Sequence, residues 1–160
     1  MTFPLEIINL SKTYNSKEAV QNISFKVNKN EIIGILGPNG CGKTTTIGMI
    51  LGLLKPTKGK VLINGVEIEK QRVELLNELN FISPYIELPK KLTVKQNLEV
   101  YGRLYDVKEL RIKIDYLSEK LRLNEFINKI TGELSSGQKN RVSLAKSIIN
   151  DPSVLLLDEP

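Results

Sequence analysis

Apolar and polar positions alternate in short blocks along the N-terminal part of the chain, and this pattern predicts β-strands. Residues 5–10 and 19–27 have the composition of two strands that flank a polar loop at residues 11–18. Residues 31–36 form a continuous apolar run between polar residues and a glycine-rich loop. Such a run predicts a strand that is buried on both faces, as in a parallel sheet.

A helix is predicted to follow the glycine-rich loop. It should run from residue 43 to about residue 54 and be closed by Pro56, because proline interrupts helical geometry. Residues 59–64 predict another strand, and the Asn64-Gly65 pair at its end predicts a hairpin turn. The first third of the chain therefore combines strands with one helix.

The middle of the chain changes to a helical pattern. Thr93 and Gln96 are spaced as a capping box, in which each side chain binds the backbone N–H of the other residue at the start of a helix. Residues 92–128 then predict a helical insert in an otherwise α/β chain, with outer bounds of about 86–135. A stripe at helical spacing predicts ordinary core packing for Leu110, Ile114, Leu117 and Leu121.

The C-terminal segments return to the α/β pattern. Residues 138–150 predict a helix that Asp151-Pro152 ends and that buries Val142, Ala145, Ile148 and Ile149. Residues 154–157 predict a second buried strand with Asp158 and Glu159 at its carboxyl end. Ligands of open α/β sheets collect at the carboxyl ends of strands, so we expect the glycine loop and this acidic pair to serve one nucleotide.

Composition narrows the possible functions. The chain has 160 residues, enough for one domain with a core, and its hydrophobic and charged fractions are ordinary for a soluble globular protein. The net charge is +5, but Lys and Arg are scattered among acidic residues and form no basic run, so we expect no nucleic-acid partner. The single cysteine, Cys41, excludes an internal disulfide, and the absence of histidine argues against a zinc site.

The sequence contains neither a signal-peptide pattern nor an apolar stretch near the roughly 20 residues that span a bilayer. Any membrane role of the chain is therefore expected to act through a partner.

The strongest chemical signal is the pattern G-x-x-x-x-G-K-[ST] at residues 37–44, a phosphate-binding loop. Glycine at positions 37, 40 and 42 lets successive backbone N–H groups point toward one anion, and the following helix adds its positive N-terminal end. Lys43 is expected to reach the β- and γ-phosphates. The Thr44 hydroxyl is expected to bind Mg²⁺.

The acidic pair supplies a second part of the expected site. Asp158 is a hard oxygen ligand suited to Mg²⁺, usually through water. Glu159 is placed to polarise the water that attacks the γ-phosphate. Together with the phosphate-binding loop, these carboxylates predict a nucleotide triphosphatase in which Glu159 and Lys43 are catalytic.

Three segments resemble a known family. Residues 37–45, 134–138 and 155–160 resemble, in order, the Walker A, signature and Walker B motifs of ATP-binding-cassette (ABC) ATPases. The resemblance implies a P-loop NTPase sheet of ABC-ATPase type with an N-terminal β subdomain and the helical insert. It further implies that two cassettes pair head to tail around two ATP molecules, each bound with Mg²⁺.

The resemblance also implies a set of binding residues. Tyr14 occupies the position of the aromatic residue that stacks on adenine, and the signature residues would contact the γ-phosphate held by the opposite subunit. Metal ligands would be Thr44 and Asp158. The expected nucleotide contacts are Tyr14, Gly37, Pro38, Asn39, Gly40, Cys41, Gly42, Lys43, Thr44, Thr45, Ser135, Gly137 and Gln138.

The chain departs from the family pattern in two places. A glutamine is expected after the strand at residues 79–82, but residues 82–86 read Ile-Ser-Pro-Tyr-Ile. This difference predicts altered Mg²⁺ coordination and altered coupling to a partner. The second departure is Ser136, where the commonest signature has glycine, and we expect it to be tolerated.

The family continues beyond Walker B into a further strand that lies between the Walker A and Walker B strands. We therefore expect a partial cassette with its C-terminal part missing, which folds poorly and turns over little ATP by itself. Residues 1–160 are accordingly interpreted as one partial ATP-binding domain.

The leading hypothesis is an ATPase subunit of an ABC transporter that drives an integral membrane permease, with export as the expected direction. It would pair with a second ABC ATPase subunit and lie peripherally on the cytoplasmic face of the membrane. One alternative is a soluble ABC ATPase of translation or DNA repair. Another is a nucleotide-binding module without hydrolysis, which the missing glutamine favours and Glu159 opposes. The motifs do not specify the transported substrate.

Overall fold

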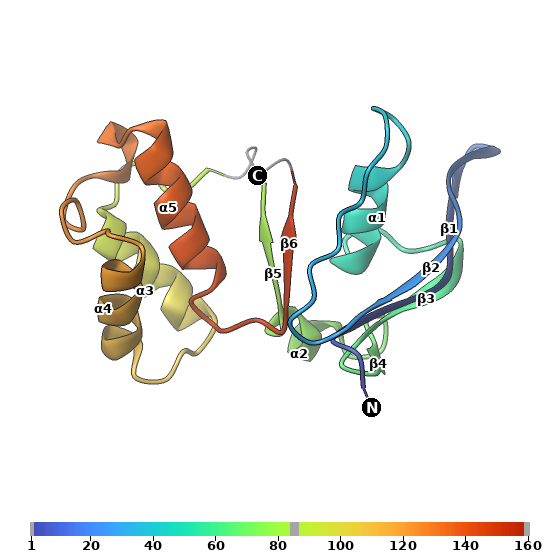
Figure 1. Ribbon diagram of the computed structural model, residues 1–160, viewed down its shortest axis with the longest axis horizontal. Coiled ribbons are helices and arrows are strands. Elements are labelled where there is room, and N and C mark those ends of the chain that lie inside the picture. Colours follow the sequence, from blue (N-terminus) through green and yellow to red (C-terminus); the bar gives the residue numbers. More distant parts are fainter. Residues whose placement is uncertain (1, 84–86, 159–160) are drawn as a thin grey trace. The chain divides into compact units, whose positions relative to one another are not determined.

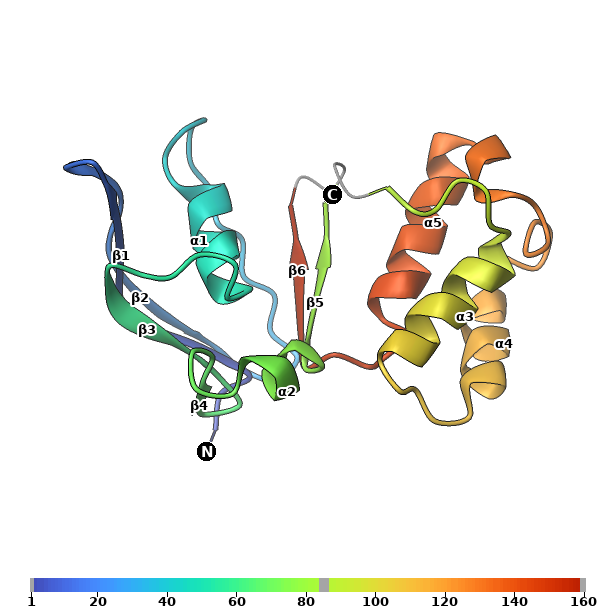
Figure 2. The same cartoon turned by 180° about the vertical axis from the view of Figure 1, so that it is seen from behind.

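The computed structural model describes residues 2–83 and 87–158. The chain forms two compact units, Met1–Leu79 and Asn80–Pro160 (Figure 1). The first unit combines an antiparallel sheet with short helices. The second is mainly helical and carries a pair of strands (Figure 2).

The sheet of the first unit has four strands in the order β2-β1-β3-β4, and all neighbours are antiparallel. These strands are β1 (Leu5–Tyr14), β2 (Lys17–Val27), β3 (Lys58–Ile63) and β4 (Val66–Glu67). The predicted hairpin turn at Asn64-Gly65 is confirmed, because it joins β3 to β4. Helix α1 (Lys43–Ile50) lies beside β2 in both views (Figures 1 and 2).

The predicted polar loop at residues 11–18 is wrong in its length. Strand β1 continues to Tyr14 and β2 begins at Lys17, so only Asn15 and Ser16 form the turn. Residues 11–13 are half-buried and residues 14–18 are exposed, so hydrophobic alternation disappears although backbone pairing continues. Tyr14 is consequently a strand residue and not a loop residue.

The predicted strand at residues 31–36 is also wrong. This segment has no regular secondary structure, and its apolar side chains are exposed, with exposed fractions of 98% for Ile32 and 94% for Leu36. A doubly buried strand needs a hydrogen-bonded neighbour, and no strand pairs with this segment among the residues that the structure describes. Apolar composition alone did not produce a strand here.

Helix α1 is shorter than predicted. It ends at Ile50, and Gly52 follows with φ of 64°, the left-handed conformation that commonly terminates helices. The helix therefore ends before Pro56, and the proline does not close it. Helix α2 (Arg72–Leu76) completes the unit. The core of the first unit joins the inner face of the sheet to α1, with Leu5, Ile7, Leu10, Val20, Met49, Ile50, Val61 and Ile63 among its buried residues.

Three helices pack together in the second unit: α3 (Val94–Leu104), α4 (Leu110–Lys120) and α5 (Ser136–Ser147). The predicted stripe is confirmed, because Ile114 and Leu117 are buried and Leu110 and Leu121 pack against them. A short 3₁₀ turn at Thr131–Glu133 precedes α5. The shared core contains Val94, Leu98, Ile114, Leu117, Leu123, Phe126, Leu134, Val142, Ala145 and Ile149.

Helix α5 begins and ends earlier than predicted. It starts at Ser136 and stops at Ser147, three residues before the predicted end at Asn150, so Asp151-Pro152 does not terminate it. Strands β5 (Leu79–Ile82) and β6 (Val154–Leu157) form a two-stranded sheet. The backbone N–H of Asp158 donates to the carbonyl oxygen of Ile82 at 2.9 Å, so the carboxyl ends of both strands lie side by side.

The predicted strand at residues 154–157 is confirmed, although it is buried only at its start, where Val154 lies. Leu157 has an exposed fraction of 47%. Within the described residues, no helix is both long and apolar enough to cross a membrane.

Candidate nucleotide-binding site

The glycine-rich loop has the backbone geometry that a phosphate cradle requires. Gly40 has φ of 81° and Gly42 has φ of 96°, both in the left-handed region. A Cβ atom on Gly42 would lie 2.3 Å from the carbonyl oxygen of Ala19 and 2.9 Å from the Val20 side chain. Only glycine therefore allows the loop to pack against β2 at this point.

The start of α1 presents unpaired donors. Gly42 is the N-cap residue and offers no side-chain cap, and no acidic residue lies in the first turn. The N–H of Thr46 makes the first helical bond, to the carbonyl oxygen of Gly42 at 2.8 Å. The N–H groups of Lys43, Thr44 and Thr45 have no acceptor within the helix. Together with the helix dipole, they form a site that favours an anion.

The Lys43 side chain turns back onto the loop. Its Nζ donates to the carbonyl oxygens of Gly37 at 2.7 Å and Pro38 at 3.0 Å, and it lies 4.0 Å from the Cys41 Sγ. The loop therefore holds a positive charge next to the free N–H groups of the helix. A polyphosphate needs this combination of close donors and a compensating cation.

The remaining loop residues face solvent or the helix. Asn39, Cys41 and Thr44 are exposed, and Thr45 is half-buried. The exposed hydroxyl of Thr44 leaves an oxygen ligand available for a cation. Thr46, which sequence reasoning did not single out, is buried and donates its hydroxyl to the Gly42 carbonyl at 2.9 Å. This bond fixes the junction between the loop and the helix.

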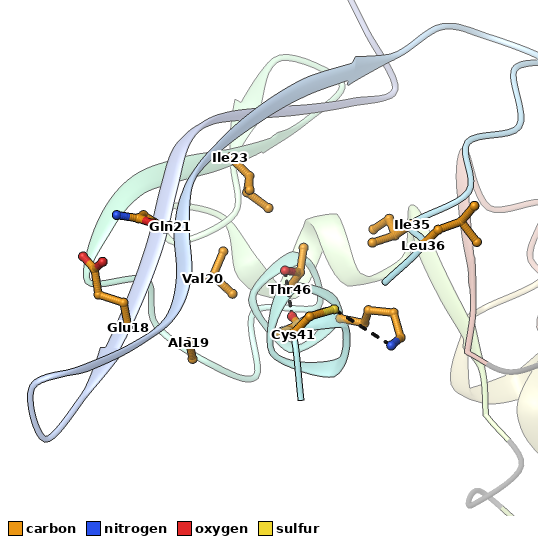
Figure 3. Close-up of a pocket in the computed structure, with 11 residues that line it drawn as sticks. Glu18, Ala19, Val20, Gln21, Ile23, Ile35, Leu36, Cys41 and Thr46 are labelled. Carbon is orange, nitrogen blue, oxygen red and sulfur yellow. Dashed lines mark hydrogen bonds between the residues drawn. The ribbon is translucent and has the colours of Figure 1, made fainter. Parts of the chain in front are cut away.

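A cavity of about 390 Å³ lies between the loop and β2 (Figure 3). Its volume is within the range of small-ligand pockets. Sequence reasoning missed the contribution of β2, whose apolar residues signalled only core packing. The cavity is lined by Glu18, Ala19, Val20, Gln21, Ile23, Ile35, Leu36, Cys41, Gly42, Lys43 and Thr46.

Tyr14 belongs to the same unit as the phosphate-binding loop and ends β1. Its exposed fraction is 43%, so part of the ring is open to a ligand. The Nζ of Lys12 lies 5.0 Å from the ring centroid, within the range of a cation–π interaction. Sequence reasoning singled out Tyr14 but not this neighbour, which the two-residue alternation of a strand brings to the same side.

The signature segment begins α5 in the second unit. Ser135 is the N-cap residue, and its N–H donates to the Gln138 Oε1 at 2.9 Å while the Gln138 N–H donates to the Ser135 Oγ at 3.3 Å. This reciprocal pair leaves the hydroxyl hydrogen of Ser135 and the amide NH₂ of Gln138 available as donors. The N–H groups of Ser136 and Gly137 are free in the first turn.

Gly137 has open space where a side chain would project, because no atom lies within 4 Å of a Cβ built there. Ser135, Ser136 and Gly137 are all exposed. The segment can therefore bind an anion presented from outside this unit.

Asp158 lies at the carboxyl end of β6 and is half-buried. It lines a cavity of about 530 Å³ that it shares with residues of α5. The lining comprises Ile82, Ser83, Glu87, Leu88, Lys90, Thr131, Ser136, Lys139, Asn140, Ser143, Leu144, Leu157 and Asp158. Glu159 and residues 84–86, where the family glutamine was expected, lie outside the described residues.

The charged residues of this second cavity are partly paired. Lys90 binds Glu87 at 2.7 Å and lowers the pKa of that carboxyl. Among the described residues, no three Cys, Asp, Glu or His side chains gather into a metal-binding cluster. The candidate oxygen ligands, Thr44 and Asp158, fit Mg²⁺ in kind, because Mg²⁺ keeps several waters and uses few protein ligands together with substrate phosphates.

The chain has the features of a phosphate-loop nucleotide-binding protein of the α/β class. Its loop has two glycines in the left-handed conformation, the helix after the loop has no side-chain cap, and the Lys43 side chain turns back onto the loop. The profile of the ABC transporter family matches residues 20–160, and the chain belongs to this family. The family resemblance of the three motifs is thereby confirmed.

Named relatives agree with this assignment. The Nod factor export ATP-binding protein I of Rhizobium etli is 37% identical over 158 residues, which cover 98% of this chain and 50% of the relative. The ABC transporter ATP-binding protein NatA of Bacillus subtilis is 32% identical over 163 residues, covering 98% of this chain and 66% of the relative. The chain thus spans about half to two thirds of the length of these two curated relatives.

Solved structures confirm the fold class. CbiO1 from Clostridium perfringens, described as part of the ABC transporter complex cbiONQ, has a TM-score of 0.86 and 29% sequence identity. The match covers 100% of this chain and 66% of that structure. The ABC-ATPase type of α/β fold is therefore shared along the whole chain.

Proposed function

We propose that the protein carrying this chain is the ATP-binding and ATP-hydrolysing subunit of an ABC transporter. The single observation that carries the proposal is the phosphate-binding loop, where Lys43 and three free N–H groups of α1 meet. Membership of the ABC transporter family supports ATP as the nucleotide. The exposed ring of Tyr14 in the same unit supports stacking on a purine base.

Each motif has a chemical role in this proposal. The loop N–H groups and Lys43 bind the β- and γ-phosphates, and the Thr44 hydroxyl and Asp158 are the residues that would hold Mg²⁺. Mg²⁺ supplies charge neutralisation on the phosphates when it is bound. Glu159 accepts a proton from the attacking water, which is the role its position after the Walker B strand suggests.

The signature segment supports a dimer. Ser135, Gly137 and Gln138 present exposed donors at a helix start, and these would bind the γ-phosphate held by a second cassette. We propose that this ATP-dependent dimer drives an integral membrane permease from the cytoplasmic face. Export is the proposed direction, because a relative that covers nearly all of this chain is named for Nod factor export.

The test compares two lysine variants that lose the same charge in the same unit. Lys43→Ala removes the charge at the loop, and Lys60→Ala removes one from an exposed position on β3. In the full-length protein we expect Lys43→Ala to weaken ATP binding by about 1.5–3 kcal/mol, the value of a charge-assisted contact. Lys60→Ala should leave it unchanged. Equal affinities of the two variants, measured by calorimetry, would contradict the loop assignment.

A nucleotide-binding module without hydrolysis is the second candidate, because no glutamine occurs at residues 82–86. Comparing ATP turnover of the full-length wild type with Glu159→Gln separates the two candidates. Turnover that falls in the variant supports the ATPase. Equal and negligible turnover in both proteins supports the module.

A further inference from the structure

Lys12 makes two directional contacts that hold it next to Tyr14. Its Nζ lies 5.0 Å from the centroid of the Tyr14 ring and donates to the backbone carbonyl oxygen of Lys55 at 2.7 Å. The two residues are separated by one position on β1, so their side chains point to the same face of the sheet. Lys12 is half-buried, whereas Tyr14 is exposed. The ammonium group is therefore anchored on one side and covers the ring on the other.

The backbone around Lys12 and Tyr14 is hydrogen-bonded to the same segment that holds the Lys12 side chain, residues 55–57. The N–H of Thr13 donates to the Thr57 Oγ1 at 3.1 Å, and the N–H of Thr57 donates to the carbonyl oxygen of Ser11 at 2.9 Å. Residues 11–13 are thus joined to residues 55–57 on both sides of Lys12. These bonds tie the end of the β1–β2 hairpin, next to Tyr14, to the segment before β3.

We infer that Lys12 is a positioning residue for the nucleotide base. Its ammonium group fixes the Tyr14 ring from one face, so that the opposite face is oriented to receive a purine by stacking. This inference rests on the proposed function. Lys12 acts through Tyr14 and not on the phosphates, because its Nζ is already engaged by the Lys55 carbonyl and by the ring.

The experiment measures two affinities in the full-length protein with Mg²⁺ present. ATP carries both base and phosphates, whereas inorganic tripolyphosphate carries the phosphates alone. For Lys12→Met, which keeps an unbranched side chain one atom shorter and loses its charge, we expect ATP binding to weaken roughly two- to fivefold, the range for an exposed cation–π contact. Tripolyphosphate binding should not change, which also shows that the loop is intact.

Two further variants make the result specific. Lys12→Arg should bind ATP with the affinity of the wild type, because a guanidinium group also stacks on an aromatic ring and can donate to the Lys55 carbonyl. In a Tyr14→Ala background, Lys12→Met should have no additional effect on ATP affinity. Such non-additivity is the expected result when one residue acts through the other.

Other outcomes overturn the inference in different ways. Equal loss of ATP and tripolyphosphate affinity in Lys12→Met would assign Lys12 to the phosphates or to folding. Unchanged ATP affinity in Lys12→Met would show that the contact does not position the ring. An effect of the same size in the Tyr14→Ala background would show that Lys12 acts independently of Tyr14. Wild-type protein that binds neither ligand would refute the proposed function itself.

Discussion

Two capping boxes of nearly the same geometry begin helices of the second unit, and only one of them lies in the signature segment. Ser135 and Gln138 are joined by bonds of 2.9 and 3.3 Å at the start of α5. Thr93 and Gln96 are joined by bonds of 2.9 and 3.1 Å at the start of α3. Both helices pack against the same core. Thr93→Ala is therefore a matched control for Ser135→Ala.

Each substitution removes one N-cap side chain and should lower the free energy of unfolding by about 1 kcal/mol. That loss is small against a typical domain stability of about 5–15 kcal/mol, so both variants should remain folded. Ser135→Ala should in addition remove a hydrogen bond to phosphate, which is worth about 1.5–3 kcal/mol. Because a dimer around two ATP molecules contains two such contacts, the total loss is about 3–6 kcal/mol. ATP-dependent dimerisation of Ser135→Ala should therefore weaken by roughly a hundredfold or more, whereas that of Thr93→Ala should not change.

The assay pairs urea unfolding with analytical ultracentrifugation of the full-length protein at saturating Mg-ATP. Hydrolysis is blocked by placing both substitutions in a Glu159→Gln background. If Ser135→Ala and Thr93→Ala weaken the dimer equally, the effect follows helix stability. The proposed contact between Ser135 and the nucleotide would then be refuted.

Four other predictions use features of single residues. Gly42→Ala should lower the free energy of unfolding by more than 1 kcal/mol in urea titrations and abolish ATP binding, because its φ is 96° and its Cβ would meet the Ala19 carbonyl at 2.3 Å. Gly137→Ala, where the space is open, should leave stability within about 0.5 kcal/mol of the wild type. Burial lowers the pKa of Lys146, so the unfolded chain binds more protons than the folded chain between that pKa and the ordinary value of about 10.4. The free energy of unfolding should rise with pH across this window, and this rise should be absent in Lys146→Met. Urea unfolding of both proteins at several pH values measures the two slopes. Identical slopes would contradict the lowered pKa of Lys146. Alkylation of the exposed Cys41 should block nucleotide binding and should be slowed by ATP, and equal labelling with and without ATP would contradict its place at the phosphates.

Local features of the site could be predicted from sequence because they depend on short spacings. The capping box at Thr93 needs only two residues three positions apart, and the structure contains both of its bonds. The helix that follows the glycine loop begins at Lys43, as the motif predicts. Such features are determined by neighbours along the chain, so one sequence is enough to find them.

Contacts between distant segments could not be predicted in this way. Lys12 is held by the carbonyl of Lys55, which is 43 positions away, and nothing in the pattern around either residue signals that bond. Asn97 is buried in α3, and its amide donates to the Thr131 Oγ1 at 2.8 Å and to the Pro89 carbonyl at 3.1 Å. It joins the segment before α3 to the turn before the signature. An asparagine within a helix gives no sign of such a role.

The segment at residues 31–36 shows why a hydrophobic run is an incomplete signal for a strand. Residues 79–82 and 154–157 are shorter still, yet both become strands, because each supplies the hydrogen-bonded neighbour of the other. Residues 31–36 find no such neighbour among the described residues, and their apolar side chains stay exposed. Burial of a run of this kind requires its backbone N–H and C=O groups to be paired first, since unpaired groups are costly once they lose water. Hydrophobicity therefore indicates which segments can occupy the interior of a sheet, whereas pairing decides which of them form strands.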